Sequence, residues 1–481
     1  VDLARQAAYE AVTAVRRDDA YANLALPAIL RRMRLQGRDA AFATELAYGT
    51  LRTGATLDAI IAISADRALD RIDPTALDAM RLGVYQLLFT RVPPHAAVSS
   101  TVDLVRSSTG TSAAGFANAV LRQIGERDLD AWLETVAPDA ATDPIGHLAV
   151  TRHHPAWIVR AFADALGGDL AETDRLLIED NERPTVTLCA RPGLADALDL
   201  ADATGGAPGA FSPYAVYLPG GSPADIPEVI ERRAHVQDEG SQLVALALAD
   251  APLVAANGAV PDESGTAAGA AQDSRWLDLC AGPGGKAALL GALAAQRGAS
   301  VTAVEVSQHR ADLVADTCAG LPVTVVCTDG RNVGTGATHG ASRLELRSGA
   351  ALPEQGFDRV LVDAPCTGLG ALRRRPEARW RRTPADLPPL TRLQRELLSA
   401  AFRAVRPGGV VAYVTCSPHI AETRVTVGET TRRTTVPVEL IDARPVFPDG
   451  MLGLGEGPTV QLWPHRHGTD AMFIALFRRT G

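Results

Sequence analysis

At residues 275–290 the chain reads RWLDLCAGPGGKAALL, a short apolar strand joined to a helix by a glycine-rich turn. Apolar, β-branched segments alternate with helical patterns along the rest of the chain, at SVTAVEVS (300–307), VTVVC (323–327), FDRVLVDAP (357–365) and GGVVAYVTCSP (408–418). Strands that are each followed by a helix form right-handed crossovers and pair in parallel. The sequence therefore predicts a doubly wound α/β domain, which we place at residues 236–481.

Helical periodicity dominates the sequence that precedes this domain. Apolar residues recur at helical spacing in blocks between residues 3 and 124, with proline and glycine between the blocks, so we expect an all-α domain over residues 1–128. Residues 129–235 are mixed and predict a connector with a small α/β element. Alanine- and glycine-rich insertions at 251–274 and 334–356 interrupt the α/β domain.

Composition limits the class of protein. The 481 residues are 46% hydrophobic and 21% charged, which is a globular balance, and they contain no apolar run long enough to cross a membrane. The N-terminus lacks the pattern of a secretion signal, so we expect a cytoplasmic protein. Six cysteines occur without C-x-x-C pairs, which favours free thiols over disulfides or zinc. A net charge of −9 argues against RNA binding over the whole surface but allows a local basic patch.

Polar signals follow three successive strands of the predicted sheet. Gly282, Gly284 and Gly285 let the backbone approach a ligand closely, although their order is not the spaced G-x-G-x-x-G of a dinucleotide fold. At the ends of the next two strands, Glu305 is suited to a ribose diol and Asp329 to an adenine amino group. These residues suit a nucleoside cofactor that has no phosphate to bind. The pattern therefore predicts S-adenosylmethionine.

Two cysteines are expected at the same edge of the sheet. The fourth strand leads to Asp363 and Cys366, and the fifth leads to Cys416. Carbon C5 of cytosine attacks a methyl group only after a thiolate has added at C6, so one cysteine would be the nucleophile and the other would assist release. Asp363 could hold the N3/N4 edge of a flipped-out base, and Lys286, the single lysine of the chain, could stabilise the developing charge.

Several motifs together resemble a known family. LDLCAGPGGK, VDAPCTGLGALRRRPEARW and VTCSP are similar to signatures of bacterial RNA cytosine-C5 methyltransferases of the RsmB, Fmu or Sun type. ELAYGTLR, VPPHAAV and FANAVLR in the first domain resemble NusB-like RNA-binding domains, with a plain helix bundle as the alternative. Three departures from the family pattern are Gly282, where Ala is more common, Glu305, where Asp is common, and Glu422-Thr423, where Glu-Asn is usual.

The resemblance implies a fold, a reaction and a set of residues. It implies a Rossmann-like methyltransferase domain that forms 5-methylcytosine in small-subunit ribosomal RNA, with Cys416 as nucleophile and Cys366 as the releasing thiol. It also implies that S-adenosylmethionine is held by Cys280, Ala281, Gly282, Pro283, Gly284, Gly285, Lys286, Glu305, Asp329 and Asp363.

A basic segment follows the Cys366 loop. Residues 371–395 hold eight arginines against Glu377 and Asp386, which suits phosphate neutralisation, and Trp380 could stack on a base. A solvated arginine-rich helix end is the alternative. The predicted RNA-binding residues are Arg373, Arg374, Arg375, Arg379, Trp380, Arg381 and Arg382.

The sequence leaves three other functions open. A non-catalytic RNA-binding or antitermination factor would lack cofactor binding, a nicotinamide-dependent oxidoreductase would need the dinucleotide glycine spacing, and an amino-group methyltransferase would carry a different loop where DAPC stands. His465, His467 and Asp470 lack a further ligand at sensible spacing, so we expect no metal site. The sequence identifies no protein partner and no particular target nucleotide.

Overall fold

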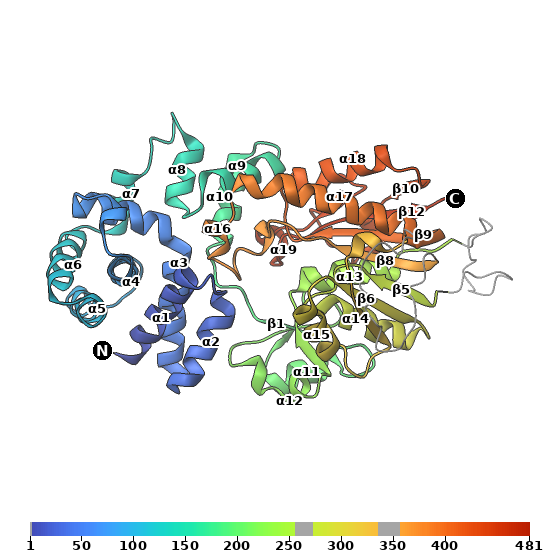
Figure 1. The fold of residues 1–481 in the computed structure, drawn as a ribbon, viewed down its shortest axis with the longest axis horizontal. Helices are drawn as coiled ribbons and strands as arrows, with labels where there is room; N and C mark the ends of the chain where they lie inside the picture. Colours follow the sequence, from blue (N-terminus) through green and yellow to red (C-terminus); the bar gives the residue numbers. More distant parts are fainter. Residues whose placement is uncertain (1, 255–272, 335–355) are drawn as a thin grey trace. The chain divides into compact units, whose positions relative to one another are not determined.

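The computed structural model describes residues 2–254, 273–334 and 356–481 (Figure 1). The chain forms two compact units, one of Val1–Arg183 with Leu372–Pro384 and the other of Pro184–Ala371 with Ala385–Gly481. Most of both predicted insertions, residues 255–272 and 335–355, lies outside the described residues.

The first unit is helical, as the sequence predicts. Leu46, Leu57, Ile60, Met80 and Leu121 belong to the buried core that helices α1 to α7 share. Its helices are α1 (Leu3–Arg17), α2 (Ala22–Met33), α3 (Gly37–Ala65), η1 (Leu69–Arg71), α4 (Pro74–Phe89), α5 (Pro94–Thr109), α6 (Thr111–Ile124), α7 (Leu129–Val136), α8 (Pro144–Thr151), α9 (Ala156–Ala165), α10 (Leu170–Glu179) and α16 (Ala378–Arg381).

Local signals set where these helices begin. Asp73 caps α4 by accepting hydrogen bonds from Thr75 N (2.9 Å) and Ala76 N (3.0 Å), and Pro74 occupies the first turn, where its missing N–H costs nothing. Helix α2 is absent from the predicted helical blocks. It contains Pro27, and burial of residues such as Leu26 in the core offsets the disturbance that proline causes.

The boundary between the two units falls inside the predicted connector, between Arg183 and Pro184. Helices α7 to α10 belong to the first unit, whereas a small antiparallel sheet with strand order β2-β3-β1-β4 belongs to the second. The division into domains at 128 and 235 stays a prediction. The strands of this sheet and the helices that connect them are β1 (Thr187–Ala190), α11 (Ala197–Thr204), β2 (Ala207–Pro208), β3 (Ala215–Tyr217), η2 (Pro223–Asp225), α12 (Pro227–Ile230) and β4 (Ala234–Val236).

A larger mixed sheet forms the centre of the second unit. Its strand order is β10-β12-β9-β8-β5-β6-β7, with β11 paired to β12. The elements are α13 (Glu239–Asp250), β5 (Arg275–Asp278), α14 (Gly285–Gln296), β6 (Ser300–Glu305), α15 (Gln308–Thr317), β7 (Val323–Cys327), η3 (Gly330–Asn332), β8 (Phe357–Asp363), η4 (Leu369–Ala371), η5 (Pro384–Asp386), α17 (Leu387–Ala404), β9 (Val405–Thr415), η6 (Ala421–Val425), α18 (Thr426–Arg433), β10 (Val438–Ile441), η7 (Arg444–Val446), β11 (Val460–Gln461), α19 (Pro464–His467) and β12 (Phe473–Arg479).

The pairing confirms the predicted parallel core and adds antiparallel strands at one edge. Strands β5 to β9 pair in parallel, but β12 is antiparallel to both β9 and β10. Each face of the sheet packs on its own core. In β9, Val410, Ala412 and Val414 contribute to one core, and Val411 and Tyr413 contribute to the other.

Helices cover both faces of this sheet, with α17 and α18 on one and α13, α14 and α15 on the other (Figure 1). This is the doubly wound arrangement that the sequence predicts. Within the described ranges, no helix is long and apolar enough to cross a membrane.

Candidate active site

The strand order reverses between β5 and β8, and in doubly wound sheets ligands bind beyond the carboxyl ends of the strands at such a point. Strand β5 ends at Asp278 and β8 ends at Asp363. Neighbouring β6 ends at Glu305, and β9 leads directly into Cys416. The topology therefore collects the predicted site residues at one edge of the sheet.

The glycine-rich turn closes onto the end of β6. Gly282 N donates to Glu305 Oε2 (3.2 Å), and Ser307 N donates to Glu305 Oε1 (3.0 Å). A Cβ atom at Gly282 would lie 2.3 Å from Glu305 Oε2, and Gly284 has φ +114°, so both positions favour glycine. The glycines thus shape the turn around a carboxylate that is only 4% exposed.

Asp278 is a buried acid that the sequence patterns do not single out. Its Oδ1 accepts from Cys280 N (3.3 Å), while Oδ2 is buried and has no hydrogen-bond partner among the described residues. Burial, and then the charge of Asp363, raises the pKa of Asp278 to about 7. An unpaired buried carboxylate oxygen is a strong acceptor for a cationic or N–H group of a ligand.

Lys286 pairs with Asp363 across the turn. The distance between Lys286 Nζ and Asp363 Oδ2 is 2.8 Å, and the two side chains are 12% and 28% exposed. Burial opposes the charge on Lys286, but Asp363 outweighs it and the pKa of the lysine rises. A permanent positive charge therefore lies beside the predicted base-binding acid.

The two predicted catalytic thiols meet. Register pairs Asp363 of β8 with Val414 of β9, so the loops that carry Cys366 and Cys416 leave the sheet side by side. Their Sγ atoms are 3.4 Å apart. The hydrogen bond to Cys416, and then burial, raises the pKa of Cys366 well above its usual value. The contact between the two thiols therefore favours a proton on Cys366.

A buried carboxylate joins the loops of the two thiols, and sequence patterns give no sign of this role. Glu422 Oε1 accepts from Thr367 N (2.8 Å) and Gln394 Nε2 (3.0 Å). The Thr367 hydroxyl lies 3.1 Å from that of Ser417, so residues adjoining both cysteines share one network. Glu422 is fully buried, and the network fixes both loops relative to each other.

Asp329 lies at the end of β7 in an ion pair that the sequence does not predict. Arg331 Nη2 lies 2.6 Å from Asp329 Oδ2, and this arginine also pairs with Glu396 of α17 (2.9 Å). The arginine lowers the pKa of Asp329, which keeps the carboxylate charged. The role of Asp329 toward adenine stays a prediction.

The structure corrects the prediction for the basic segment. Arg379 is fully buried in the first unit, where it donates to Asn181 Oδ1 (2.7 Å), Asp180 O (2.6 Å) and His153 O (3.1 Å). Arg373 is 4% exposed and pairs with Glu179. Their guanidinium groups hold helices together, so neither presents a face to phosphate.

The remaining residues of the segment are more accessible. Trp380 is half-buried and its indole donates to Leu51 O (2.7 Å). Arg381 donates to Val15 O in α1 and to Ala20 O between α1 and α2. Arg374 and Arg382 are half-buried and Arg375 is exposed. For these five the RNA-binding role stays a prediction.

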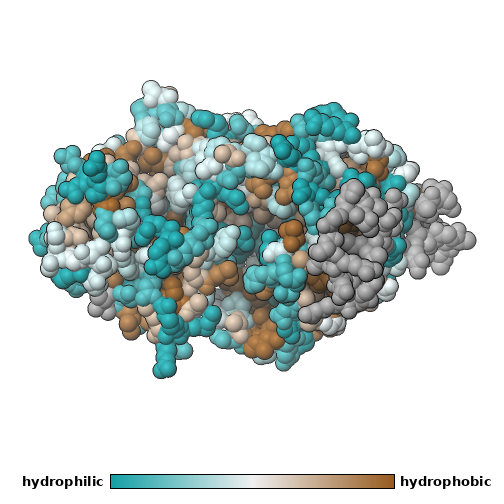
Figure 2. All heavy atoms as spheres, viewed as in Figure 1, coloured by the Kyte–Doolittle hydropathy of each residue, from teal (hydrophilic) through white to brown (hydrophobic). Residues whose placement is uncertain are grey.

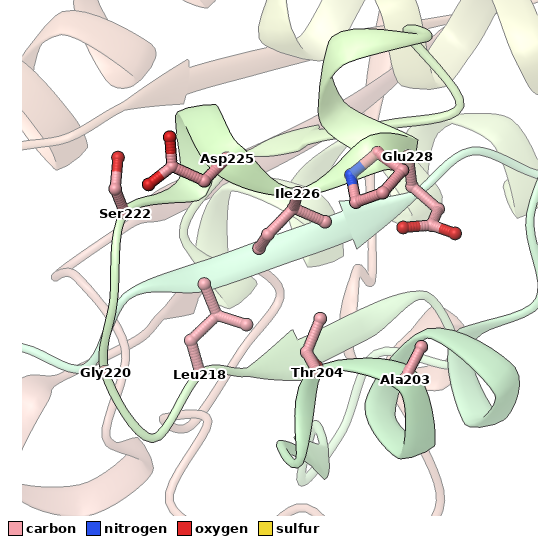
Figure 3. A pocket seen from close by; sticks show the side chains of 9 residues that line it. Ala203, Thr204, Leu218, Gly220, Ser222, Asp225, Ile226 and Glu228 are labelled. Atoms are coloured by element: carbon pink, nitrogen blue, oxygen red, sulfur yellow. The ribbon is translucent and has the colours of Figure 1, made fainter.

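Two further features, His467 and a cavity on the small sheet, contribute no residue to the candidate site. His467 uses both ring nitrogens on backbone groups of Trp463 and Leu452. A cavity of about 310 Å³ on the small sheet has Asp225 and Glu228 on its rim (Figure 3) but includes no residue of the glycine turn and neither of the two predicted catalytic thiols.

A mixed sheet with this strand order, a glycine-rich turn after its first parallel strand and acids at the next strand ends define a Rossmann-like methyltransferase. Family comparison agrees, since the family described as 16S rRNA methyltransferase RsmB/F matches residues 267–478 and the NusB family matches residues 2–126. The chain belongs to the RsmB/F family of ribosomal RNA methyltransferases.

Individual relatives extend over most of the chain. A protein of Mycobacterium tuberculosis named as a methyltransferase is 54% identical, over 100% of this chain and 97% of its own length. Ribosomal RNA small subunit methyltransferase B of Salmonella typhi is 32% identical over 79% of each chain. The crystal structure of PH0851 superposes with a TM-score of 0.76 at 20% identity, over 100% of this chain and 99% of that one, which shows the shared fold.

Family membership establishes an S-adenosylmethionine-dependent ribosomal RNA methyltransferase and removes the oxidoreductase alternative. The residues present fit this cofactor. Glycine at position 282 keeps a Cβ atom away from the Glu305 carboxylate, and the unpaired Asp278 Oδ2 suits the cofactor's ammonium group.

Proposed function

We propose that this protein methylates carbon C5 of a cytosine in small-subunit ribosomal RNA through a covalent bond between Cys416 and C6. The observation that carries the proposal is the 3.4 Å separation of the Cys366 and Cys416 sulfur atoms beside the glycine-rich turn. A ribosomal RNA methyltransferase that modified a ribose or an exocyclic amine would have no use for two adjoining thiols.

Addition is the first step of the proposed reaction. The Cys416 thiolate forms a bond to C6, and the electron pair of the C5–C6 double bond makes C5 nucleophilic. When bound, S-adenosylmethionine would supply an electrophilic methyl group to C5 and would leave as S-adenosylhomocysteine. In this proposal Asp363 holds the N3/N4 edge and Lys286 stabilises the charge that develops on the ring. The ion pair between the two side chains supports these roles.

Release is the second step. Once Cys416 is bonded to C6 it carries no charge, so the interaction that keeps the proton on Cys366 is lost and the pKa of Cys366 falls toward its usual value. Cys366 can then lose its proton to solvent, and its thiolate takes the C5 proton. The electrons of the C5–H bond restore the double bond, and Cys416 leaves as a thiolate.

We also propose that the helical unit binds RNA. Its match to the NusB family and the exposed Arg375 of the segment packed within it support this role. Arg375→Ala should weaken binding of a ribosomal RNA transcript by a few-fold, and an unchanged affinity would remove this residue from the proposed interface.

Nucleoside analysis tests the proposed reaction. Small-subunit ribosomal RNA incubated with the purified protein and methyl-labelled S-adenosylmethionine should yield labelled 5-methylcytidine after complete digestion. Cys416→Ala should yield none. Label in a different nucleoside, or undiminished 5-methylcytidine from Cys416→Ala, would overturn the proposal.

A further inference from the structure

The second unit contains an arginine-lined hollow that is separate from the thiols and the glycine turn. Its volume is about 520 Å³. We call it the α17–α18 hollow, because these two helices and η3 form it. Figure 2 shows hydrophilic side chains over α18. The lining residues are Arg331, Arg392, Arg395, Glu396, Ser399, Arg403, Thr430 and Arg433.

The charge of this hollow is strongly positive for a chain with a net charge of −9. Five of its lining residues are arginines and a single one, Glu396, is acidic. Arg331 and Arg395 have ion-pair partners in Glu396 and Glu429. Arg392 and Arg433 are exposed and form no ion pair within the part of the chain that the structure describes. Two uncompensated guanidinium groups thus face one cavity.

The lining indicates the chemistry of the ligand. Guanidinium groups bind phosphate oxygens in a bidentate manner, and among the described residues no aromatic side chain lines the hollow to stack on a base. The hydroxyls of Ser399 and Thr430 already donate to helix carbonyls, which leaves the arginines as the donors. A volume of about 520 Å³ is far more than one phosphate group needs, so an extended polyanion fits better than a free ion.

The segments that form the hollow also lead to the active site. Helix α17 carries Gln394, which donates to Pro365 O (2.9 Å) in the Cys366 loop. Helix α18 follows the Cys416 loop, and η3 follows Asp329. A polyanion in the hollow would therefore contact the elements that hold the thiols and the predicted adenine site.

We propose that the α17–α18 hollow binds the sugar–phosphate backbone of the substrate RNA, independently of base sequence, and that Arg392 and Arg433 are its principal contacts. The identity of the polyanion as RNA rests on the proposed function. The sequence places Arg392 and Arg395 at the end of the basic segment, whose earlier arginines Arg373 and Arg379 are buried. Within the basic segment, the phosphate-binding residues are therefore those at its C-terminal end, which lies on α17.

Binding measurements on the full chain test this proposal. Arg392→Ala/Arg433→Ala should weaken binding of a small-subunit ribosomal RNA transcript by roughly tenfold at low salt. It should also flatten the slope of log K against log salt by about 1.5 to 2, since each lost phosphate contact removes about 0.7 to 1. Arg232→Ala/Arg444→Ala is the matched control, because it removes two exposed arginines of the same unit that pair with Asp316 and Asp442 instead.

A gain-of-binding variant makes the test independent of folding. Glu396→Gln removes the acid of the hollow while Arg331 keeps its ion pair with Asp329, so it should tighten RNA binding by a few-fold, which a misfolded protein does not do. Inorganic phosphate at millimolar concentration should compete poorly. An affinity and salt slope of Arg392→Ala/Arg433→Ala equal to the control's would overturn the proposal and leave an acidic protein surface as the occupant. Formation of 5-methylcytidine by the wild type is measured separately, so failure of the proposed reaction would be recognised on its own.

Discussion

At the scale of single residues, the site combines groups whose charges depend on one another. Asp278 lies near Asp363 and Lys286, and burial with the charge of Asp363 raises the pKa of Asp278 from 3.8 to about 7. A carboxyl group with a raised pKa binds a proton more tightly in the folded than in the unfolded state. Its contribution to the free energy of unfolding is therefore largest below pH 4 and is lost as the pH rises toward 7.

Asp278→Asn removes this pH dependence. Without cofactor, the variant should be more stable than the wild type at pH 8, by up to about 4 kcal/mol, because it carries no charge to bury. Near pH 4 the two proteins should be alike. Urea unfolding at a series of pH values measures the difference, and a gap that does not change between pH 4 and pH 8 would contradict the assignment.

How far single residues can be predicted depends on topology. Cys366 and Cys416 are predictable because neighbouring parallel strands bring their carboxyl ends together, whatever the side-chain details. Glu422 stands out in the sequence only as part of a motif, since no spacing rule shows that it accepts hydrogen bonds from the Cys366 loop. The prediction for Arg379 is wrong because a run of charges does not show which member is buried.

At the scale of elements, the packing of α3 on α4 explains the ELAYGTLR motif. A Cβ atom at Gly49 would lie 2.0 Å from Cζ of Tyr85, so the ring sits directly on the glycine backbone. The Tyr85 hydroxyl donates to Glu45 Oε1 (2.6 Å), which fixes the ring. The glycine is there for close approach of two helices, and not for a turn.

Gly49→Ala should therefore destabilise the helical unit. An added methyl group that forces the ring away costs about 1–3 kcal/mol in a packed core. Gly115→Ala is the control, since Gly115 lies inside α6 and, apart from the helix's own backbone, no described atom lies within 4 Å of the position that its methyl group would take. It should be neutral or stabilising by up to about 1 kcal/mol. Thermal unfolding distinguishes the two, and equal effects would contradict the packing of Tyr85 on Gly49.

Elements with strong periodicity are predictable, and the exceptions have physical causes. Strands β5 to β9 follow the predicted apolar segments. Helix α2 is absent from the prediction because Pro27 interrupts its pattern, although tertiary packing retains the helix. The antiparallel direction of β12 is not predicted either, because strand direction depends on the connection and not on the apolar pattern.

At the scale of the whole molecule, the chain leaves the second unit after Ala371 and returns to it at Ala385. The intervening residues pack within the helical unit, where Arg379 is fully buried and burial lowers its pKa to about 9. The helical unit is therefore completed by a segment far beyond Arg183 in the sequence. No sequence pattern indicates such an excursion, because it depends on contacts between distant residues.

Arg379→Lys should lower the stability of the helical unit by about 2–4 kcal/mol, since an ammonium group cannot replace a guanidinium fork that serves three buried acceptors. The control is Arg375→Lys on the same segment, where the side chain is exposed and the effect should stay within about 0.5 kcal/mol. Urea unfolding followed by fluorescence measures both. A fully stable Arg379→Lys with weakened RNA binding would restore the phosphate role.

Two thiols that share one reaction are central to the proposed function of the whole molecule. Denaturing electrophoresis of the protein incubated with labelled ribosomal RNA and S-adenosylmethionine tests this directly. Cys366→Ala should migrate as a stable protein–RNA adduct, because Cys416 still adds to C6 while the C5 proton is not removed. Neither Cys416→Ala nor the double variant should form one. An adduct in Cys416→Ala, or its absence from Cys366→Ala at wild-type turnover, would contradict the assignment of the two sulfur atoms.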